Sequence, residues 1–495
     1  MAEVLLSPGV LARENDQSFL QAQPIQAGAA ILGPTVKGPV GIPTLVTTYS
    51  EYQNKFGTVV ESGSAEYTYF TSISAYNYFQ QGGDSLLVTR VVSGSYTPAS
   101  SSLIANANTS ASFVLETISE GVEMNSTGSE DSNTGALATG SKDNVRWEIV
   151  SPNTSSGTFS LLIRRGNDIT TSKTVLETWA NLSLDPNASN YIEKVIGNSK
   201  QEVASDASTG EYYIKNSGTY NTLSNYVRVK SVLTPTLNFF DNSGTAKSNF
   251  TGSIPVAGSG SFGAATGEAF AGVAGTFYGD IGTNTQGLVA GNYTDSLNLL
   301  ANQDLFQYNL IVAPGLTRES HSSPLTTMVD NSQTRGDNLS IIDLVNYDTA
   351  TLSTVTSQAS GVDSSYAASY WPWLQTIDPD LGSQVWVPAS AMIPGVFAFN
   401  DRSGEAWFAP AGLNRGGLST VIRAERNLTN GNRNTLYQAN VNPIATFPNV
   451  GVVVFGQKTM QKKASALDRV NVRRLLIELK SYISQIADNL VFEQN

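Results

Sequence analysis

The sequence predicts an α+β multidomain fold: an α/β core formed by the N- and C-terminal regions, with one or more inserted antiparallel β-rich domains of barrel or sandwich type. Two patterns indicate this. Between about residues 93 and 270, short segments alternate apolar and polar residues between clusters of Ser, Thr, Asn and Gly, as antiparallel strands do. From about residue 296, apolar runs alternate with helix-like segments, which indicates parallel βαβ units.

These patterns divide the chain of 495 residues into parts. A chain of this length exceeds what one hydrophobic core usually holds. The expected parts are an arm at 1–20, the first part of the core at 21–92, the inserted β-rich region at 93–270, an α/β core segment at 271–395 and a C-terminal domain at 396–495.

The core elements follow from local patterns. AAILGPTVKGPVGIPTLV and, later, SLLVTRVV are apolar and β-branched, which predicts buried strands. Between them, EYTYFTSISAYNYFQQGG predicts a helix that stops at Gly82 and Gly83. Further on, FQYNLIVAPG and LSIIDLV predict strands on either side of a helix formed by PLTTMVDNSQTRG. The apolar positions at helical spacing in the first helix are Tyr69, Phe70, Ile73, Tyr76 and Phe79.

In the inserted region, NVRWEIV, TFSLLIRRG and YVRVKSVL each place apolar residues on one face of a predicted strand. Arg146 and Glu148 fall on the opposite face of the first strand. GSGSFG matches the G-x-G-x-x-G pattern of dinucleotide sites, but the glycine-rich segment after it is a poor helix, so we expect a flexible loop. The expected inward-facing residues are Val145, Trp147, Ile149, Phe159, Leu161, Ile163, Val227, Val229 and Leu233.

The composition argues against several functions. A net charge of −12 disfavours nucleic acid as the main partner, and the absence of cysteine excludes disulfides and thiolate zinc sites. His321 is the only histidine, and neither a G-x-S-x-G nor a P-loop motif occurs, so we expect no enzyme, cofactor or metal. The start MAEV lacks the features of a signal peptide, and Gln17 to Val36 is too polar to span a bilayer, so we expect no membrane insertion.

A basic segment near the C-terminus stands out in this acidic chain. Between Phe455 and Lys480, seven basic residues accompany two acidic ones. Part of this segment predicts an amphipathic helix. Its basic positions either dock on an acidic partner, form an ordinary solvated face, or form salt bridges with the surplus acidic residues of the chain itself. The basic residues are Lys458, Lys462, Lys463, Arg469, Arg473, Arg474 and Lys480, and the expected buried stripe consists of Val472, Leu475, Leu476, Leu479, Ile483 and Ile486.

Several segments, in order, resemble the contractile tail sheath proteins of myophages. The overall sequence pattern is most similar to the sheath proteins of T4-like phages. LLSPGV is similar to the sheath N-terminus, and VPASAMIPGVFAFND, WFAPAGLNRGGL, NTLYQANVNPI and VVVFGQKT resemble sheath motifs of the C-terminal half. DRVNVRRLL, followed by a helix and VFEQN, resembles the sheath C-terminal signature. NLSLDPNASNYIEKVIG in the inserted region is similar, less distinctively, to related sheath inserts.

The resemblance implies a structural subunit of the virion that is made in the host cytoplasm. Such a subunit polymerises helically with copies of itself around a tail tube protein, between baseplate and tail terminator proteins, and contracts to drive the tube through the host cell envelope. In the family the C-terminal domain faces the tube and the inserts project outward, so the seven basic residues become tube-facing candidates. Terminal arms add strands to a neighbour's sheet, which makes Val4, Leu5, Leu6, Leu490, Val491 and Phe492 inter-subunit strand candidates.

The chain departs from the family pattern where it ends. Related sheath proteins continue past the position of VFEQN, so we expect a truncated chain, with its C-terminal arm absent, rather than an unusually short sheath. Two other functions stay open. One is the sheath of a phage-derived bacterial contractile injection system, which residue patterns do not separate from a phage sheath. The other is a β-rich secreted surface or adhesion protein, which would need a secretion signal.

Overall fold

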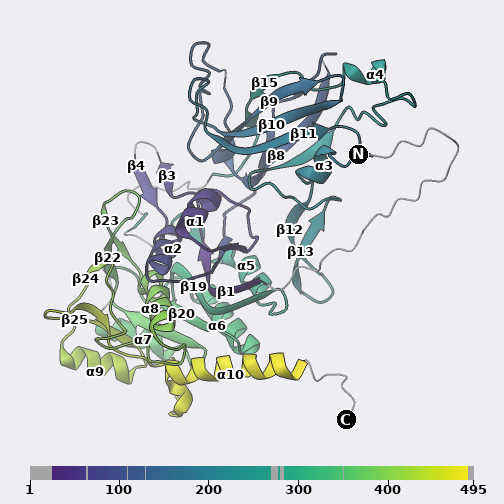
Figure 1. Cartoon of the computed structure of the whole chain (residues 1–495). Helices are drawn as coiled ribbons and strands as arrows, with labels where there is room; N and C mark the ends of the chain where they lie inside the picture. Colours follow the sequence, from purple (N-terminus) through teal and green to yellow (C-terminus); the bar gives the residue numbers. More distant parts are fainter. Residues whose placement is uncertain are drawn as a thin grey trace, which may run out of the picture.

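A mostly parallel eight-stranded sheet forms the centre of the core (Figure 1). The computed structural model describes residues 25–62, 65–108, 110–128, 130–268, 277–278, 284–348 and 351–488. Neighbouring strands from β5 to β25 run parallel, and the edge strands β2 and β26 pair antiparallel. In spatial order the strands are β2 (Thr44–Val46), β5 (Leu86–Arg90), β1 (Ile25–Gly33), β19 (Phe306–Thr317), β20 (Leu339–Asp343), β21 (Ala367–Trp371), β25 (Asn442–Phe447) and β26 (Gly451–Val454).

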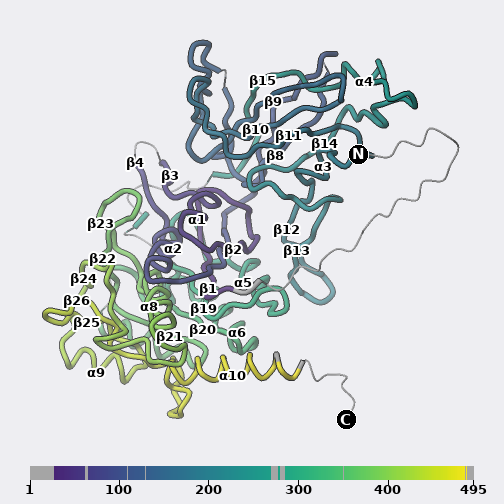
Figure 2. Tube along the Cα trace, viewed as in Figure 1, coloured from purple at the N-terminus to yellow at the C-terminus, as the bar shows by residue number. Residues whose placement is uncertain are grey.

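Helices cover both faces of this sheet, as parallel strands require. Ala29 and Ile31 of β1 join one hydrophobic cluster, whereas Ala30 and Leu32 join the other. Because β1 and β5 come from the N-terminal region and β19 to β26 from the C-terminal half, the predicted α/β core is confirmed (Figure 2). The first cluster is covered by α1 (Tyr49–Phe56), α2 (Phe70–Gln80) and α8 (Ala389–Ser403), and the second by α5 (Thr294–Leu300), α6 (Ser322–Arg335), α7 (Leu352–Ser360) and α9 (Asn430–Gln438).

The predicted helix between the first two core strands is α2, and the two predicted strands after residue 296 are β19 and β20 with α6 between them.

Capping residues fix where several helices start. The Thr48 hydroxyl accepts the Glu51 N–H at the start of α1, and Gly57 ends that helix with a φ of 70°. At the start of α9, Thr429 and Asn432 form a reciprocal capping box.

The inserted region forms two antiparallel sheets that share one hydrophobic cluster, so it is a sandwich. Phe113 of one sheet stacks on Phe159 of the other, with ring centroids 5.5 Å apart. One sheet contains β11 (Val175–Ser183), β10 (Thr158–Arg165), β9 (Val145–Asn153) and β15 (Gly258–Gly260); the other contains β14 (Val227–Val232), β8 (Ala111–Glu120), β6 (Pro98–Ser101), β16 (Phe262–Gly263) and β7 (Ile104–Ala105).

Two expectations for the inserted region, for Leu233 and for the GSGSFG segment, need correction. Leu233 is 51% exposed, because it follows the last residue of β14, whereas the other expected inward-facing residues are buried. Arg146 lies on the predicted opposite face but is fully buried, since it pairs with Glu130 and lies 3.6 Å from Asp168. Burial of a guanidinium needs such partners.

The GSGSFG segment is the second correction, because it forms strands and not the predicted loop. It forms β15, which pairs with β9, and β16, which pairs with β6, so it passes from one sheet to the other. A Cβ on Gly260 would lie 2.4 Å from Cζ2 of Trp147 and 2.6 Å from the Ser102 hydroxyl. Glycine fits here because the Trp147 and Ser102 side chains occupy the space that a Cβ would need.

Smaller elements complete the described fold, and the predicted arm and strand candidates Val4, Leu5, Leu6, Leu490, Val491 and Phe492 lie outside the described residues. The predicted domain boundaries stay a prediction. The remaining elements are β3 (Val59–Ser62), β4 (Ala65–Thr68), η1 (Val122–Met124), α3 (Ile192–Val195), β12 (Lys200–Ser205), β13 (Tyr212–Ser217), α4 (Ser248–Thr251), β17 (Asn284–Thr285), β18 (Leu288–Val289), η3 (Ala290–Tyr293), β22 (Leu374–Ile377), β23 (Gln384–Val387), β24 (Val421–Ala424), η4 (Ala466–Asp468) and α10 (Val470–Asp488).

Candidate interaction surface on α10

The basic segment predicted to contain an interaction site ends in α10, which lies along the lower edge of the core and extends away from it (Figure 1). The chain before the helix fixes its first turn. The Val470 N–H donates to the Gln457 carbonyl at 2.9 Å, and the Thr459 N–H donates to the Asp468 carbonyl at 3.0 Å. The start of α10 is therefore held against the segment that follows β26.

Two arginines anchor the helix to the core. Arg474 forms a bidentate pair with Asp401 at the end of α8, at 2.7 and 2.5 Å, and lies 4.9 Å from the centre of the Phe397 ring. Arg473 donates to the Ser365 hydroxyl and lies 4.0 Å from the Tyr366 ring centre. Both arginines are buried, and burial lowers the pKa of Arg473. These side chains belong to the packing face of α10 together with Val470 and Ile477.

The expected buried stripe of α10 is largely exposed, so that prediction was wrong. Val472 and Leu475 are half-buried, but the stripe beyond them faces away from the core. The periodicity was correct, and the error lay in assigning the apolar face to the core when the arginine face packs there. The exposed fractions are 42% for Leu476, 43% for Leu479, 62% for Tyr482, 61% for Ile483 and 47% for Ile486.

The stripe has the spacing of a helix–helix contact. Leu476, Leu479, Ile483 and Ile486 follow one another at intervals of three, four and three residues. This spacing matches the a and d positions of a heptad, whose side chains pack into a partner helix or groove. A row of exposed large apolar side chains is unusual on a monomer surface and indicates an interaction face.

The other basic candidates lie in two places. Lys458 and Arg469 meet at Tyr437 of α9: Lys458 lies 4.7 Å from the ring centre, and Arg469 donates to the Tyr437 hydroxyl and pairs with Asp468 at 3.2 Å. Burial and the nearby Arg469 charge lower the pKa of Lys458. Lys462 and Lys463 are exposed, and Lys480 donates to the Arg335 carbonyl at 3.3 Å.

Sequence reasoning missed the partners that divide these basic residues into anchors and exposed charges. Tyr366, Asp401 and Tyr437 are 107, 73 and 32 residues away from the charges they contact, so no local pattern connects them. One signal was present. Val470, Arg473, Arg474 and Ile477 also recur at helical spacing, a stripe that hydrophobicity alone rejects because it contains two arginines.

The outer edge of β26, at one side of the central sheet, is already occupied by another segment of this chain. The segment 412–418 lies along the outer edge of β26: the Gly412 N–H donates to the Val454 carbonyl and the Val454 N–H donates to the Gly416 carbonyl, both at 2.8 Å. The Leu418 N–H donates to the Val452 carbonyl at 3.0 Å. A strand from another subunit would therefore have to displace this segment or pair elsewhere.

His321 lies in a buried position at the start of α6, where its Nδ1 accepts the Thr317 N–H at 3.2 Å. Among the described residues, no three His, Cys, Asp or Glu side chains are placed together so that they could hold a metal ion. The described helices also include none with the length and apolar character needed to cross a membrane.

The comparisons with known proteins agree with the motifs. Residues 287–460 match the family described as "Phage tail sheath protein central domain". This range holds β19 to β26, the C-terminal strands of the central sheet. The resemblance to tail sheath proteins is thereby confirmed, and curated relatives of the chain are named tail sheath proteins.

The tail sheath protein of Vibrio phage KVP40 is 43% identical over 110 residues, 22% of this chain and 16% of that protein. The tail sheath protein of Enterobacteria phage T4 is 29% identical over 248 residues, 46% of this chain and 37% of that protein. The matches thus span less than two thirds of either relative. A sheath tail protein from Listeria innocua shares the fold at 10% identity, with a TM-score of 0.50 over 91% of this chain and 74% of that one.

Proposed function

We propose that this chain is a structural subunit of a contractile phage tail sheath, which polymerises helically around the tail tube and contracts to drive the tube through the host cell envelope. The observation that carries the proposal is the sheath central-domain match over residues 287–460. Such a role is mechanical: the subunit acts through contacts with its own copies and with the tube, so it requires no catalytic residue.

The charge distribution supports a tube-facing role for the C-terminal region. Residues 402–495 carry 12 Lys and Arg against six Asp and Glu, whereas residues 1–401 carry 17 against 35. A positive region on an otherwise negative subunit favours one orientation of approach to an acidic surface. Of the seven candidates, Lys462 and Lys463 are exposed and available for docking, whereas Arg473 and Arg474 are used as internal anchors and Arg469 is held by Tyr437 and Asp468.

The exposed stripe of α10 supports assembly in a second way. Apolar area that stays in contact with water in one chain favours association, because its burial releases about 25 cal/mol per Å². We propose that this stripe is covered in the assembled sheath. We also propose that the terminal strand candidates link subunits, and that baseplate and tail terminator proteins bound the polymer within the virion.

Assembly on tubes tests the proposal. The full-length gene product, including any residues that follow Asn495, is mixed with the tail tube protein from the same gene cluster, and the products are examined by electron microscopy. Helical sleeves around tubes are expected. Complete failure to form sleeves at any salt concentration, with both proteins folded, would contradict the sheath role.

The docking face has its own variant. Lys462→Glu/Lys463→Glu should leave the monomer folded and reduce sleeve formation strongly, because it reverses the charge proposed to face the tube. Lys142→Glu/Lys215→Glu is the matched control, since it alters two exposed lysines of the inserted region and changes the net charge equally. Equal assembly by both double variants would remove the docking claim while leaving the sheath role intact. Capsid genes nearby would separate a phage sheath from a bacterial injection device.

A further inference from the structure

Among the described residues, two contacts of different strength hold the inserted sandwich to the core. The first, which we name the Arg90 hub, consists of Arg90, Lys37, Glu120 and Asp143. Arg90 is fully buried at the end of β5, and its guanidinium donates to the Gly38 carbonyl of the core at 2.8 Å and to the Glu120 carbonyl of the insert at 2.7 Å. Lys37 pairs with Asp143 at 3.2 Å and donates to its carbonyl at 3.1 Å.

The second attachment is the β12–β13 hairpin, which descends from the sandwich onto the core (Figure 1). Alternate residues of its strands face the core: Val203, Tyr212 and Ile214 are half-buried against the second core cluster. Near its tip, the Tyr212 hydroxyl donates to Asp295 at 3.2 Å, and Asn302 donates to Glu211 at 3.3 Å. Both of these hydrogen bonds are exposed to solvent.

The hairpin cannot hold its own position. Within the described sheets, β12 and β13 pair with each other and with no third strand. A two-stranded hairpin is marginally stable in water unless it packs on something else. Its contact with the core is half-buried and its polar bonds are exposed, so its release costs far less free energy than disruption of the buried hub.

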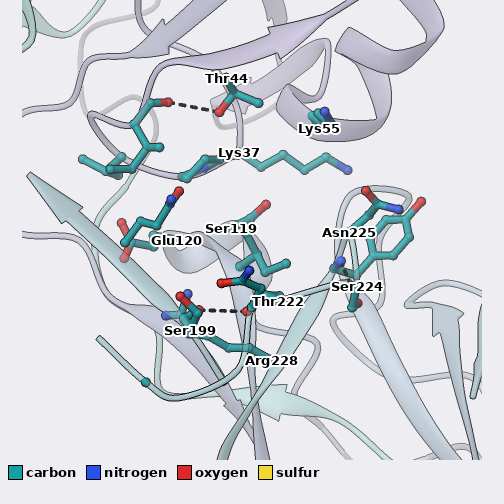
Figure 3. A pocket seen from close by; sticks show the side chains of 18 of the residues that line it. Lys37, Thr44, Lys55, Ser119, Glu120, Ser199, Thr222, Ser224, Asn225 and Arg228 are labelled. Atoms are coloured by element: carbon teal, nitrogen blue, oxygen red, sulfur yellow. Dashed lines mark hydrogen bonds between the residues drawn. The ribbon is translucent and has the colours of Figure 1, made fainter. Parts of the chain in front are cut away.

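Between the two attachments lies a cleft of about 940 Å³ (Figure 3). Lys37, Val40 and Lys55 line it from the core, and Asn225 and Arg228 line it from the sandwich. Its wall also includes the hub residues Lys37, Glu120 and Asp143 and residues from the base of the hairpin, Ser199, Gln201 and Asn216. The cleft leaves space into which the sandwich can rotate, because no packed side chains fill it.

We infer that the β12–β13 hairpin is a releasable strut that sets the angle between sandwich and core, and that its release lets the sandwich pivot about the Arg90 hub. The hub stays closed because the Arg90 guanidinium is fully buried and donates to a carbonyl on each side, Gly38 of the core and Glu120 of the insert. The hairpin opens because its contacts are shallow. This inference concerns the single chain and does not depend on the sheath role.

Two spin labels test the strut directly, because the chain has no cysteine and Ser155→Cys and Ser353→Cys can be labelled uniquely. Both serines are exposed, one in the turn between β9 and β10 and the other on α7. Pulsed electron spin resonance then measures the distance between sandwich and core. Hydrogen exchange measures, in parallel, whether the hairpin is docked.

In Tyr212→Ala/Ile214→Ala the hairpin loses its core-facing side chains. We expect amide exchange in residues 200–217 to become about tenfold faster or more, and the label distance to broaden or gain a second population. Tyr213→Ala/Lys215→Ala is the matched control on the outward face of the same strand and should change neither. If the double variant does not fold, Ile214→Ala alone serves for both measurements.

Two results would overturn the inference. Faster hairpin exchange with an unchanged label distance would show that the hairpin does not set the angle. Unchanged exchange in the variant would show that Tyr212 and Ile214 do not hold the hairpin on the core.

Discussion

At the scale of single residues, buried charges explain where hydrophobic patterning fails. Arg146, Arg473 and Arg474 occupy positions that a hydrophobicity pattern assigns to solvent, yet each is buried against carboxylates, hydroxyls or aromatic rings. Long aliphatic stems and planar guanidinium groups make arginine suited to such positions. A pattern that counts only apolar side chains cannot identify them.

Arg474 gives the first prediction at this scale. Arg474→Met leaves Asp401 without its bidentate partner, so we expect the free energy of unfolding to fall by about 2 kcal/mol, discounted for the partial exposure of Asp401. Lys462→Met removes an exposed charge and should change the free energy of unfolding by less than about 0.5 kcal/mol. Urea unfolding of the two variants checks this. Equal effects would show that the pair does not anchor α10.

Asp343 gives the second prediction at the residue scale. It ends β20 and accepts hydrogen bonds from the Ser390 N–H, at 3.0 Å, and from the Ser390 hydroxyl at the start of α8. Burial raises the pKa of Asp343 from 3.8 to about 7, against the opposing effect of the Ser390 hydrogen bonds. Because the folded state holds this proton more tightly, the stability it contributes is full below pH 3.8 and is lost as the pH rises to about 7.

The Asp343→Asn variant should lack this contribution to pH dependence. Between about pH 5 and about pH 8, the thermal unfolding midpoint of the unsubstituted protein should fall relative to that of the variant. Asp330→Asn, on the exposed side of α6, is the control. A constant difference between the protein and Asp343→Asn over this range would mean that Asp343 is already ionised in the fold.

At the scale of elements, α10 shows the limit of periodicity. The sequence predicted its existence, its basic character and the spacing of its apolar stripe, but not which face meets the core. That choice depends on Ser365, Tyr366, Asp401 and Phe397, which come from distant segments. The loop prediction for the GSGSFG segment fails for a related reason. Glycine content alone cannot distinguish a loop from a strand whose glycine makes room for neighbouring side chains.

A pair of isoleucines tests the orientation of α10. Ile477→Gln places an amide on the buried face and should destabilise the chain by about 2 kcal/mol, whereas Ile483→Gln alters a side chain that is 61% exposed and should cost less than about 0.5 kcal/mol. Ile483→Gln should instead reduce self-association in sedimentation experiments. Equal destabilisation by both would mean that the stripe is buried in the monomer.

A pair of glycines tests the strand built from GSGSFG. Gly260→Ala should destabilise the sandwich by about 1–3 kcal/mol, because its Cβ overlaps Trp147. Gly258→Ala is the control, since no atom lies within 4 Å of its Cβ. Tryptophan fluorescence during unfolding follows both. A tolerated Gly260→Ala would restore the flexible-loop prediction.

At the scale of the whole molecule, the α/β core, the antiparallel insert and the family resemblance were predictable. Parallel strands buried on both faces and period-two strands leave distinct patterns, and the sheath motifs are specific. The position of the insert relative to the core was not predictable. This position depends on the contacts of Arg90, on the pair of Lys37 with Asp143 and on the hairpin. Residues that contact each other here lie far apart in the sequence, by 106 residues for Lys37 and Asp143.

The order of strands in the central sheet has a consequence for folding during synthesis. β1 and β5 emerge early, but β19, which pairs with β1, is translated only after the strands of the sandwich. The sandwich can therefore close while one edge of β1 still has no partner. An unpaired apolar strand invites aggregation, so we expect the nascent chain to be most prone to aggregation until β19, which ends at residue 317, has been made.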